Sequence, residues 1–308
     1  MQSEKRLDGG VWIDLYDPTD QERDAVARAH DIRIPARREL EEIETSSRLS
    51  QEGSTLHLNM PVATLDGDGV LVASPIGFVL SERVLVTIHF ATLESLTTVQ
   101  SKLDTQQASP PGAFAMIIEA MVDYAADQLE KIAADLGQIS GALFRRLESS
   151  PSNIKQTTAM LKRMLAAIGF AGEQLSHLRE GLLGLQRILA FSTEVCQAWK
   201  PDDFLARLNI AQRDLHSLVE HETHLSDKAQ FLLDANLGFI NTEQNDIFKV
   251  LTIVSVVGIP PTLIASMYGM NFHYMPELSW SFGYWYGLGV IALSTVIPMV
   301  WFKWRGWW

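Results

Sequence analysis

Two long runs without a charged residue stand near the end of this sequence. They are Val250 to Met270 and Gly283 to Phe302. A helix needs about 20 mostly apolar residues to cross a hydrocarbon core of about 30 Å. Neither run has the polar face expected of an amphipathic core helix, which disfavours two buried helices of a soluble protein. The sequence therefore predicts a two-pass membrane protein.

Positive charges beside the two runs predict how the chain crosses the membrane. Lys249 precedes the first run, Lys303 and Arg305 follow the second, and the loop 271–282 carries Glu277 but no Lys or Arg. Because basic residues collect on the cytoplasmic side, we expect both termini in the cytoplasm and the loop outside, across the cell inner membrane. The first ten residues hold no apolar run, so no signal peptide is expected.

Charge and cysteine content exclude some partners and sites. The formal net charge is -12, and such a surface repels phosphate backbones, so a nucleic acid partner is not expected. An acidic surface suits a protein that meets cations, but it is also typical of soluble proteins without a special ligand. The single cysteine, Cys196, excludes an intrachain disulfide and a cysteine-based zinc cluster.

Residues 1–110 predict a compact α/β unit, which makes the whole chain an α+β membrane protein. The expected elements are a strand at Val11–Leu15, a helix from the Thr19–Glu22 capping box to His30, a helix from Pro35 to about Ser46, and strands at Thr55–Leu65, Val70–Ala73, Gly77–Leu80 and Val84–His89. Turn residues separate the later strands as in an antiparallel meander. No phosphate loop, dinucleotide fingerprint or nucleophile elbow is present, so neither an enzyme nor a bound cofactor is expected.

Helical spacing of apolar residues follows the boundary at Ala108–Gly112. Breaks near 149–152 and 200–203 divide this region into three helices. The third, from Asp202 to Met270, would hold about 69 residues and measure roughly 100 Å. A helix of that length cannot be buried in one globule, so we expect a stalk that packs against partners.

Two spanning helices per chain cannot enclose a water-filled path, so transport would need several copies. The first run is the better candidate for lining a pore, because it carries the hydroxyl residues Thr252, Ser255, Thr262 and Ser266. Pro260–Pro261 also removes backbone hydrogen bonds near its middle, which membrane helices tolerate where neighbours or waters replace them. Hydroxyls that only hold helices together are an equal alternative.

The segment Tyr268–Leu278 reads YGMNFHYMPEL. It resembles the signature of the CorA family of magnesium channels, whose first membrane helix ends in YGMN and is followed by MPEL. The resemblance extends to Asn245, Lys249 and Pro260–Thr262, and to the N-terminal WIDL. It implies a homopentamer with an amino-terminal α/β domain, a funnel of long stalk helices and a five-helix pore.

The resemblance also implies a division of the chain and a set of pore residues. The expected parts are a cytoplasmic α/β domain at 1–110, a helical stalk region at 111–246, a pore-lining span at 247–270, a periplasmic loop at 271–282, a second span at 283–302 and a cytoplasmic tail at 303–308. The implied outer mouth is Gly269, Met270 and Asn271, and the implied lumen residues are Asn245, Phe248, Leu251, Ile259 and Thr262.

The physical chemistry of Mg²⁺ suits these implied positions. Mg²⁺ gives up its inner waters reluctantly. A ring of neutral amides at Asn271 would hydrogen-bond the hydrated ion, whereas carboxylates would hold it more tightly and slow its release. Apolar rings such as Leu251 and Ile259 could close the path by excluding water.

Two departures from the family pattern stand out. Family members often carry an acid where this chain has His273, so Glu277 remains the only acid of the loop. This weakens attraction of cations at the mouth and adds a titratable group there. The usual basic tail is reduced to Lys303, Arg305 and a Trp-rich end.

Cytoplasmic Mg²⁺ bound between subunits is implied as a regulatory ligand that holds the channel shut. Its carboxylate ligands are not identified by the sequence, and the weak candidates on the stalk are Asp202, Asp203, Asp214, Glu220, Glu222 and Asp227. A solvated helix face is the simpler explanation of these acids. The same holds for the His and Glu residues of 216–224, which lack the HExxH spacing of a zinc site.

The resemblance to the CorA family implies uptake of Mg²⁺, with Co²⁺ and possibly Ni²⁺ as further substrates, driven by the membrane potential. The expected partners are other copies of the chain, the lipid bilayer and divalent cations. A zinc transporter of the same superfamily is the close alternative, although its branch tends to carry another residue in the middle of GMN. A membrane sensor or scaffold that does not conduct is the alternative of another class.

Overall fold

The computed structural model describes residues 2–42, 48–145, 154–196, 199, 203–270, 273 and 275–307. The elements are, in order, β1 (Gln2–Leu7), β2 (Gly10–Tyr16), α1 (Asp20–His30), α2 (Arg37–Leu40), β3 (Leu49–Glu52), β4 (Thr55–Leu65), β5 (Leu71–Leu80), β6 (Val84–His89), α4 (Glu94–Lys102), α5 (Pro110–Arg145), α6 (Ile154–Val195), α7 (Phe204–Tyr268), the 3₁₀ helix η3 (Pro276–Ser279) and α8 (Gly283–Trp304). The chain divides into two compact units. Unit 1 is 1–150 with 163–233, and unit 2 is 151–162 with 234–308.

Unit 1 contains a six-stranded mixed sheet in the order β1-β2-β6-β5-β4-β3. The antiparallel meander predicted for its later strands is confirmed, whereas β2 pairs with β6 in parallel. The prediction of two strands within 70–80 was wrong, because β5 is one strand in which Pro75 faces Pro61 of β4. Two residues without an N–H can face each other at a non-hydrogen-bonded pair without losing a ladder bond.

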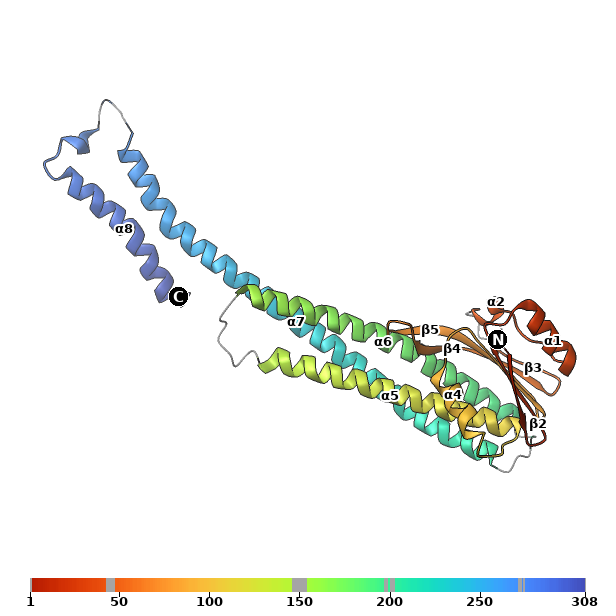
Figure 1. Ribbon diagram of the computed structural model, residues 1–308. Coiled ribbons are helices and arrows are strands. Elements are labelled where there is room, and N and C mark those ends of the chain that lie inside the picture. Colours follow the sequence, from red (N-terminus) through yellow and green to blue (C-terminus); the bar gives the residue numbers. More distant parts are fainter. Residues whose placement is uncertain are drawn as a thin grey trace. The chain divides into compact units, whose positions relative to one another are not determined.

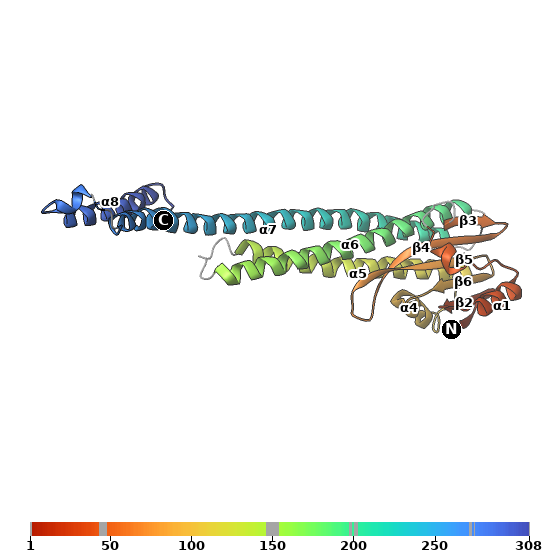
Figure 2. The ribbon, with the colours of Figure 1, turned by 90° about the horizontal axis from the view of Figure 1, so that it is seen from above.

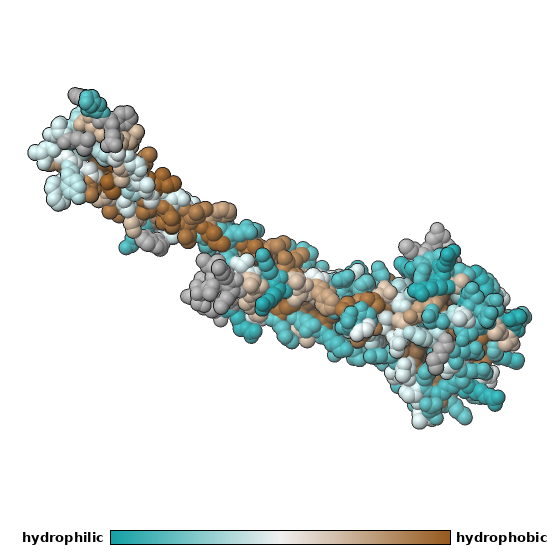
Figure 3. Space-filling view, turned by 45° about the horizontal axis from the view of Figure 1, so that its top comes forward, coloured by the Kyte–Doolittle hydropathy of each residue, from teal (hydrophilic) through white to brown (hydrophobic). Residues whose placement is uncertain are grey.

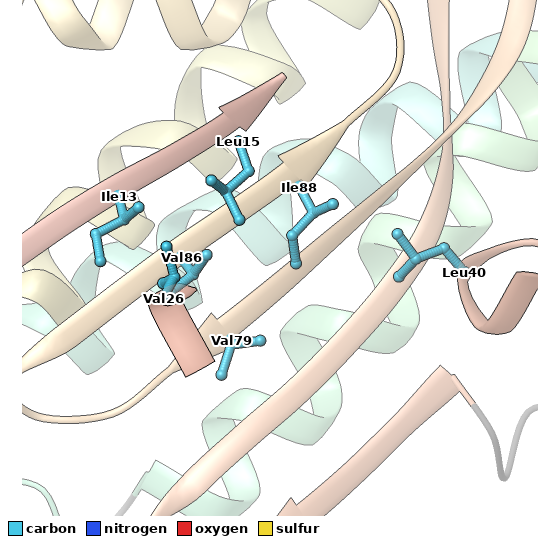
Figure 4. Close-up of a cluster of buried hydrophobic side chains, with 7 residues drawn as sticks. All are labelled: Ile13, Leu15, Val26, Leu40, Val79, Val86 and Ile88. Carbon is cyan, nitrogen blue, oxygen red and sulfur yellow. The ribbon is translucent and has the colours of Figure 1, made fainter. Parts of the chain in front are cut away.

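Helices cover both faces of this sheet. On one face, Val26 of α1 and Leu40 of α2 pack against inward-pointing strand residues, as Figure 4 shows. The members of this cluster are Ile13, Leu15, Val26, Leu40, Val79, Val86 and Ile88. On the other face, the Phe78 ring meets Phe114 of α5 edge-on, with ring centroids 5.4 Å apart. Alternate strand residues therefore fill two separate cores.

Three long helices lie side by side in unit 1: α5, the part of α6 after residue 162, and the part of α7 before residue 234 (Figures 1 and 2). The predicted boundary near 110 corresponds to the start of α5, where Pro110 and Pro111 occupy the first turn. Proline is tolerated there because first-turn N–H groups have no partner within the helix. The apolar spacing predicted for the three helices is confirmed by buried leucines such as Leu136, Leu182 and Leu215.

The third predicted helix is confirmed as α7, which has 65 residues and continues through Pro260 and Pro261. At 1.5 Å per residue it is roughly 100 Å long. In the described part of the chain, α7 and α8 are long and apolar enough to cross a membrane. In unit 2, α8 runs back along the last part of α7, and Figure 3 shows hydrophobic residues gathered there.

Candidate functional site

The candidate pore segment is the part of α7 from residue 245 to residue 268, with the turn Gly269–Met270 after it. The implied lumen residues Phe248, Leu251 and Ile259 are 63%, 60% and 64% exposed. Exposed apolar side chains of this size need lipid or protein around them.

The remaining implied lumen residues share this exposure. Asn245 and Thr262 are exposed, as are Gly269 and Met270 at the implied outer mouth. Asn271, which completes the implied mouth, lies outside the described residues. The exposed side chains of this segment are therefore free to meet other copies of the chain.

One face of the same segment is half-buried. Its members recur every three or four residues, as expected for one side of a helix: Ile253, Val257, Pro260, Ile264 and Tyr268. The half-buried residues of α8 also recur on one side, including Gly283, Gly287 and Ile291. Because α8 runs back along α7 here, each helix shields one side of the other.

The implied lumen residues lie on the side of α7 opposite its half-buried face. With 3.6 residues per turn, each residue advances about 100° around the axis. On that wheel the centre of the lumen set lies about 180° from the centre of the half-buried set. Within residues 250–268, Ser255 is the one half-buried residue on the lumen side. Helix α8 therefore leaves the candidate pore face unobstructed.

The hydroxyls of this segment donate to their own helix. Thr262 Oγ1 donates to the carbonyl of Gly258 at 2.8 Å, and Thr252 Oγ1 donates to the carbonyl of Phe248 at 2.8 Å. A hydroxyl that donates in this way still has lone pairs that accept hydrogen bonds from water. These threonines can therefore offer oxygen atoms to a wet path, and no hydrogen bond between helices is required of them.

The described part of the loop between α7 and α8 is held by short-range contacts. Ser279 Oγ donates to the Pro276 carbonyl at 2.6 Å, and Gly283 N donates to the Trp280 carbonyl at 3.1 Å. Glu277 is half-buried and His273 is exposed. The first bond closes η3 on itself, and the second forms the turn that leads from η3 into α8.

A cavity of about 550 Å³ lies between the end of α7 and the start of α8. Small residues, aromatic rings and one acid line it: Ala265, Tyr268, Gly269, Glu277, Trp280, Ser281, Gly283, Tyr284, Gly287, Leu288 and Ile291. Gly269 belongs both to this cavity and to the implied mouth, so we expect a change in the packing of the loop to alter the mouth.

Gly283 is required where η3 meets α8. A Cβ atom at this position would lie 2.2 Å from the backbone oxygen of Glu277, far inside van der Waals contact. We expect Gly283→Ala to displace the loop from the mouth and to lower cation uptake by roughly tenfold, which corresponds to about 1.4 kcal/mol. The measurement is the initial uptake rate into proteoliposomes at equal protein content.

Gly289→Ala is the matched control, because a Cβ at Gly289 in the same helix meets nothing within 4 Å. Normal uptake by both variants would show that the loop geometry does not matter. Equal loss in both would indicate that α8 tolerates no added methyl group.

The stalk acids are dispersed in the described chain. Asp203, Asp214, Glu220 and Asp227 are exposed, and Asp202 lies outside the described residues. Glu220 Oε1 lies 3.5 Å from His216 Nε2. Among the residues that the structure describes, no three His, Cys, Asp or Glu side chains come together as a metal-binding group. The solvated helix face remains the simplest description of these four acids within one subunit.

The expectation of a solvated face was wrong for Glu222. This side chain is 1% exposed, its Oε2 lies 3.0 Å from Nη1 of Arg179, and its Oε1 accepts a hydrogen bond from Ser226 at 2.7 Å. The physical reason is its position, seven residues after the buried Leu215 and three before the buried Leu225. That spacing was a signal available in the sequence.

Comparison with known proteins covers almost the whole chain. The profile of the family described as "CorA-like Mg2+ transporter protein" matches residues 8–304. The magnesium transport protein CorA of Escherichia coli strain K12 is 32% identical over 310 aligned residues, which span 100% of this chain and 95% of that protein.

Two solved structures share the fold. The complete structure of the CorA magnesium transporter from Methanocaldococcus jannaschii gives a TM-score of 0.74 at 17% identity, covering 97% of this chain and 92% of that chain. The full-length CmaX protein gives a TM-score of 0.68 at 14% identity, covering 97% and 88%. The long helix and the two apolar C-terminal helices thus belong to an architecture known from experiment.

Proposed function

This chain belongs to the family of CorA-like Mg²⁺ transporters and mediates Mg²⁺ transport, and we propose that it does so as a homopentameric channel of the cell inner membrane. The observation that carries the proposal is the arrangement of α7. Its candidate lumen face lies opposite the face that α8 shields, so several copies can meet along it. Two spans per chain cannot enclose a wet path, and a ring of copies can.

Ions reach the path through the mouth formed by Gly269, Met270 and Asn271. Five amides from Asn271 form a wide polar collar that hydrogen-bonds the hydrated ion without stripping its waters. Neutral oxygens bind weakly enough for release, which conduction requires. The membrane potential supplies about 2.3 kcal/mol per charge for each 100 mV, and roughly twice that for Mg²⁺.

Apolar rings below the mouth close the path. Ile259, Leu251 and Phe248 each present a large exposed apolar side chain on the candidate lumen face. A narrow ring of such side chains excludes water, and an ion cannot pass without its hydration. Asn245 supplies a polar ring at the cytoplasmic end, where the path opens to water.

Cytoplasmic Mg²⁺ regulates the channel by binding between stalks. Four exposed carboxylates of the stalk are available to a neighbouring subunit: Asp203, Asp214, Glu220 and Asp227. Glu222 is not available, because it forms an ion pair with Arg179. A divalent ion would screen the repulsion between facing carboxylates, and its loss would let the stalks move apart. This supports closure at high internal Mg²⁺.

Both termini lie in the cytoplasm. Lys249 at the start of the first span and Lys303 and Arg305 at the end of the second span support this orientation. The N-terminal domain and the stalk then sense internal Mg²⁺, while the loop 271–282 faces the periplasm.

Flux measurements with the purified protein test the proposal. We expect proteoliposomes to take up Mg²⁺, and also Co²⁺ and Ni²⁺, when a negative internal potential is applied, and to stop at high internal Mg²⁺. Uptake of Zn²⁺ and of no other ion would show that the proposal of a magnesium channel is wrong and that the chain is a zinc transporter. No flux of any divalent ion, from particles with the mass of a pentamer, would favour a sensor or scaffold.

A further inference from the structure

Helix α8 ends in a hydrogen-bonded turn at residues 302–307. Gly306 has φ +71°, and its N–H donates to the Lys303 carbonyl at 3.1 Å, while Trp307 N donates to the Phe302 carbonyl at 3.1 Å. This pair of bonds is a Schellman motif, which needs a left-handed residue that glycine supplies at little cost. The motif turns the chain back, so that Trp307 packs on Phe302 with ring centroids 5.3 Å apart.

Aromatic rings and two bases share this turn, and we call residues 301–307 the C-terminal cap. The Trp301 and Phe302 rings lie 5.1 Å apart, and the guanidinium of Arg305 lies 5.4 Å from the Trp301 ring centroid. Trp304 is 84% exposed. A ring this exposed at the end of a spanning helix is suited to the headgroup level of a bilayer.

The two bases of the cap have no carboxylate partner among the residues that the structure describes. The sequence contains no Asp or Glu after Glu277, and no ion pair involves Lys303 or Arg305 in the part of the chain that the structure describes. The base that begins the first span differs, because Lys249 Nζ lies 2.9 Å from Asp246 Oδ1. Among the described residues, no carboxylate therefore compensates the charge of the cap.

We propose that the C-terminal cap binds the headgroup of an anionic phospholipid. The phosphate oxygens accept hydrogen bonds from Lys303 and Arg305, and the exposed Trp304 ring lies at the boundary between headgroups and acyl chains. The inference relies on α8 crossing the membrane and on no other part of the proposed function. It gives a negative partner to two bases that have none among the described residues, and a lipid environment to an exposed indole.

The charge complementarity favours a lipid over a protein partner. A lipid phosphate can approach the end of a spanning helix from any side, whereas a carboxylate would have to come from a neighbouring subunit. Each base near an anionic surface strengthens binding by roughly fivefold, so the pair should give a preference of about 25-fold.

The test is native mass spectrometry of the full-length protein in detergent, titrated with phosphatidylglycerol or phosphatidylcholine. The test variant is Lys303→Gln with Arg305→Gln. The control is Lys162→Gln with Arg213→Gln, which removes two exposed bases outside the predicted spans. We expect wild type and control to prefer phosphatidylglycerol by at least tenfold, and the test variant to lose most of that preference.

Either of two results would overturn the proposal. One is equal binding of the two lipids by the wild type. The other is a test variant that prefers phosphatidylglycerol as strongly as the wild type does. If that variant also loses the mass of the oligomer, the two bases bind carboxylates of a neighbouring subunit instead of a lipid. Mg²⁺ flux into phosphatidylcholine vesicles is measured separately, so a failure of transport is distinguished from a failure of lipid binding.

Discussion

Asn271→Ala is expected to reduce Mg²⁺ uptake by about two orders of magnitude, because loss of several hydrogen bonds worth about 1 kcal/mol each removes the collar that receives the hydrated ion. The residue lies outside the described part of the chain, directly after the exposed Gly269–Met270 turn. A methyl group cannot hydrogen-bond the inner waters of Mg²⁺, so the ion would lose its first stabilising site. Initial rates of Mg²⁺ uptake into proteoliposomes measure the effect.

Asn209→Ala serves as the control for the loss of one asparagine per subunit. Asn209 is exposed on α7 within unit 1, away from the membrane span. We expect normal uptake from this variant and an unchanged oligomer mass in both. Normal uptake by Asn271→Ala would contradict the role given to the amide collar.

Ile259→Ser is expected to make the channel leak. Five serines in place of five isoleucines would turn an apolar ring into one that water can wet, so closure at high internal Mg²⁺ would fail. We expect Mg²⁺ influx at high internal Mg²⁺ to rise by at least tenfold over wild type, equivalent to about 1.4 kcal/mol removed from the barrier. The measurement is influx into proteoliposomes preloaded with Mg²⁺.

Val254→Ser is a closely matched control. Val254 and Ile259 are each 64% exposed in the subunit, and both lie in the apolar run of α7. Val254 lies on the flank of the helix, outside the face that carries the lumen candidates. A leak through Val254→Ser as large as that through Ile259→Ser would mean that the wrong face has been assigned to the lumen.

The membrane part of the fold could be predicted from the sequence, because a chain segment inside lipid must be apolar and must satisfy its own backbone hydrogen bonds. An apolar run without charges has few structural options, and α7 and α8 follow the predicted runs closely. The family signature at Tyr268–Leu278 supplied the lumen residues, since spacing alone left pore lining and helix packing equally supported. The structure adds that the half-buried face lies opposite them.

The elements that the sequence prediction missed are polar or short. Strand β1 consists largely of exposed residues, and its apolar pattern is too weak to indicate a strand. The Asp8–Gly9 pair was a usable signal, because Gly9 has φ +75° in the two-residue turn between β1 and β2. Helix α2 ends at Leu40, short of the predicted end near Ser46, and 43–47 lie outside the described residues.

Contacts between distant residues could not be predicted from local patterns. The ion pair between the buried carboxylate of Glu222 and the exposed guanidinium of Arg179 joins α7 to α6. The close approach of Gly283 to Glu277 depends on how the loop folds over α8. Charge patterns indicate which residues are costly to bury, and only the packing shows which partner compensates them.

Thiol accessibility tests the central claim that α7 presents its unshielded face to a water-filled path. The native Cys196 is buried, and burial raises its pKa to about 12, so it stays unreactive and gives a clean background. Thr262→Cys places a thiol on the candidate lumen face above Ile259, and Ile264→Cys places one on the face shielded by α8.

The measurement is Mg²⁺ flux through each cysteine-substituted variant before and after an impermeant, positively charged thiol reagent is added from the periplasmic side. The account predicts that the reagent blocks flux through Thr262→Cys and leaves flux through Ile264→Cys unchanged. Block through Ile264→Cys with none through Thr262→Cys would contradict it.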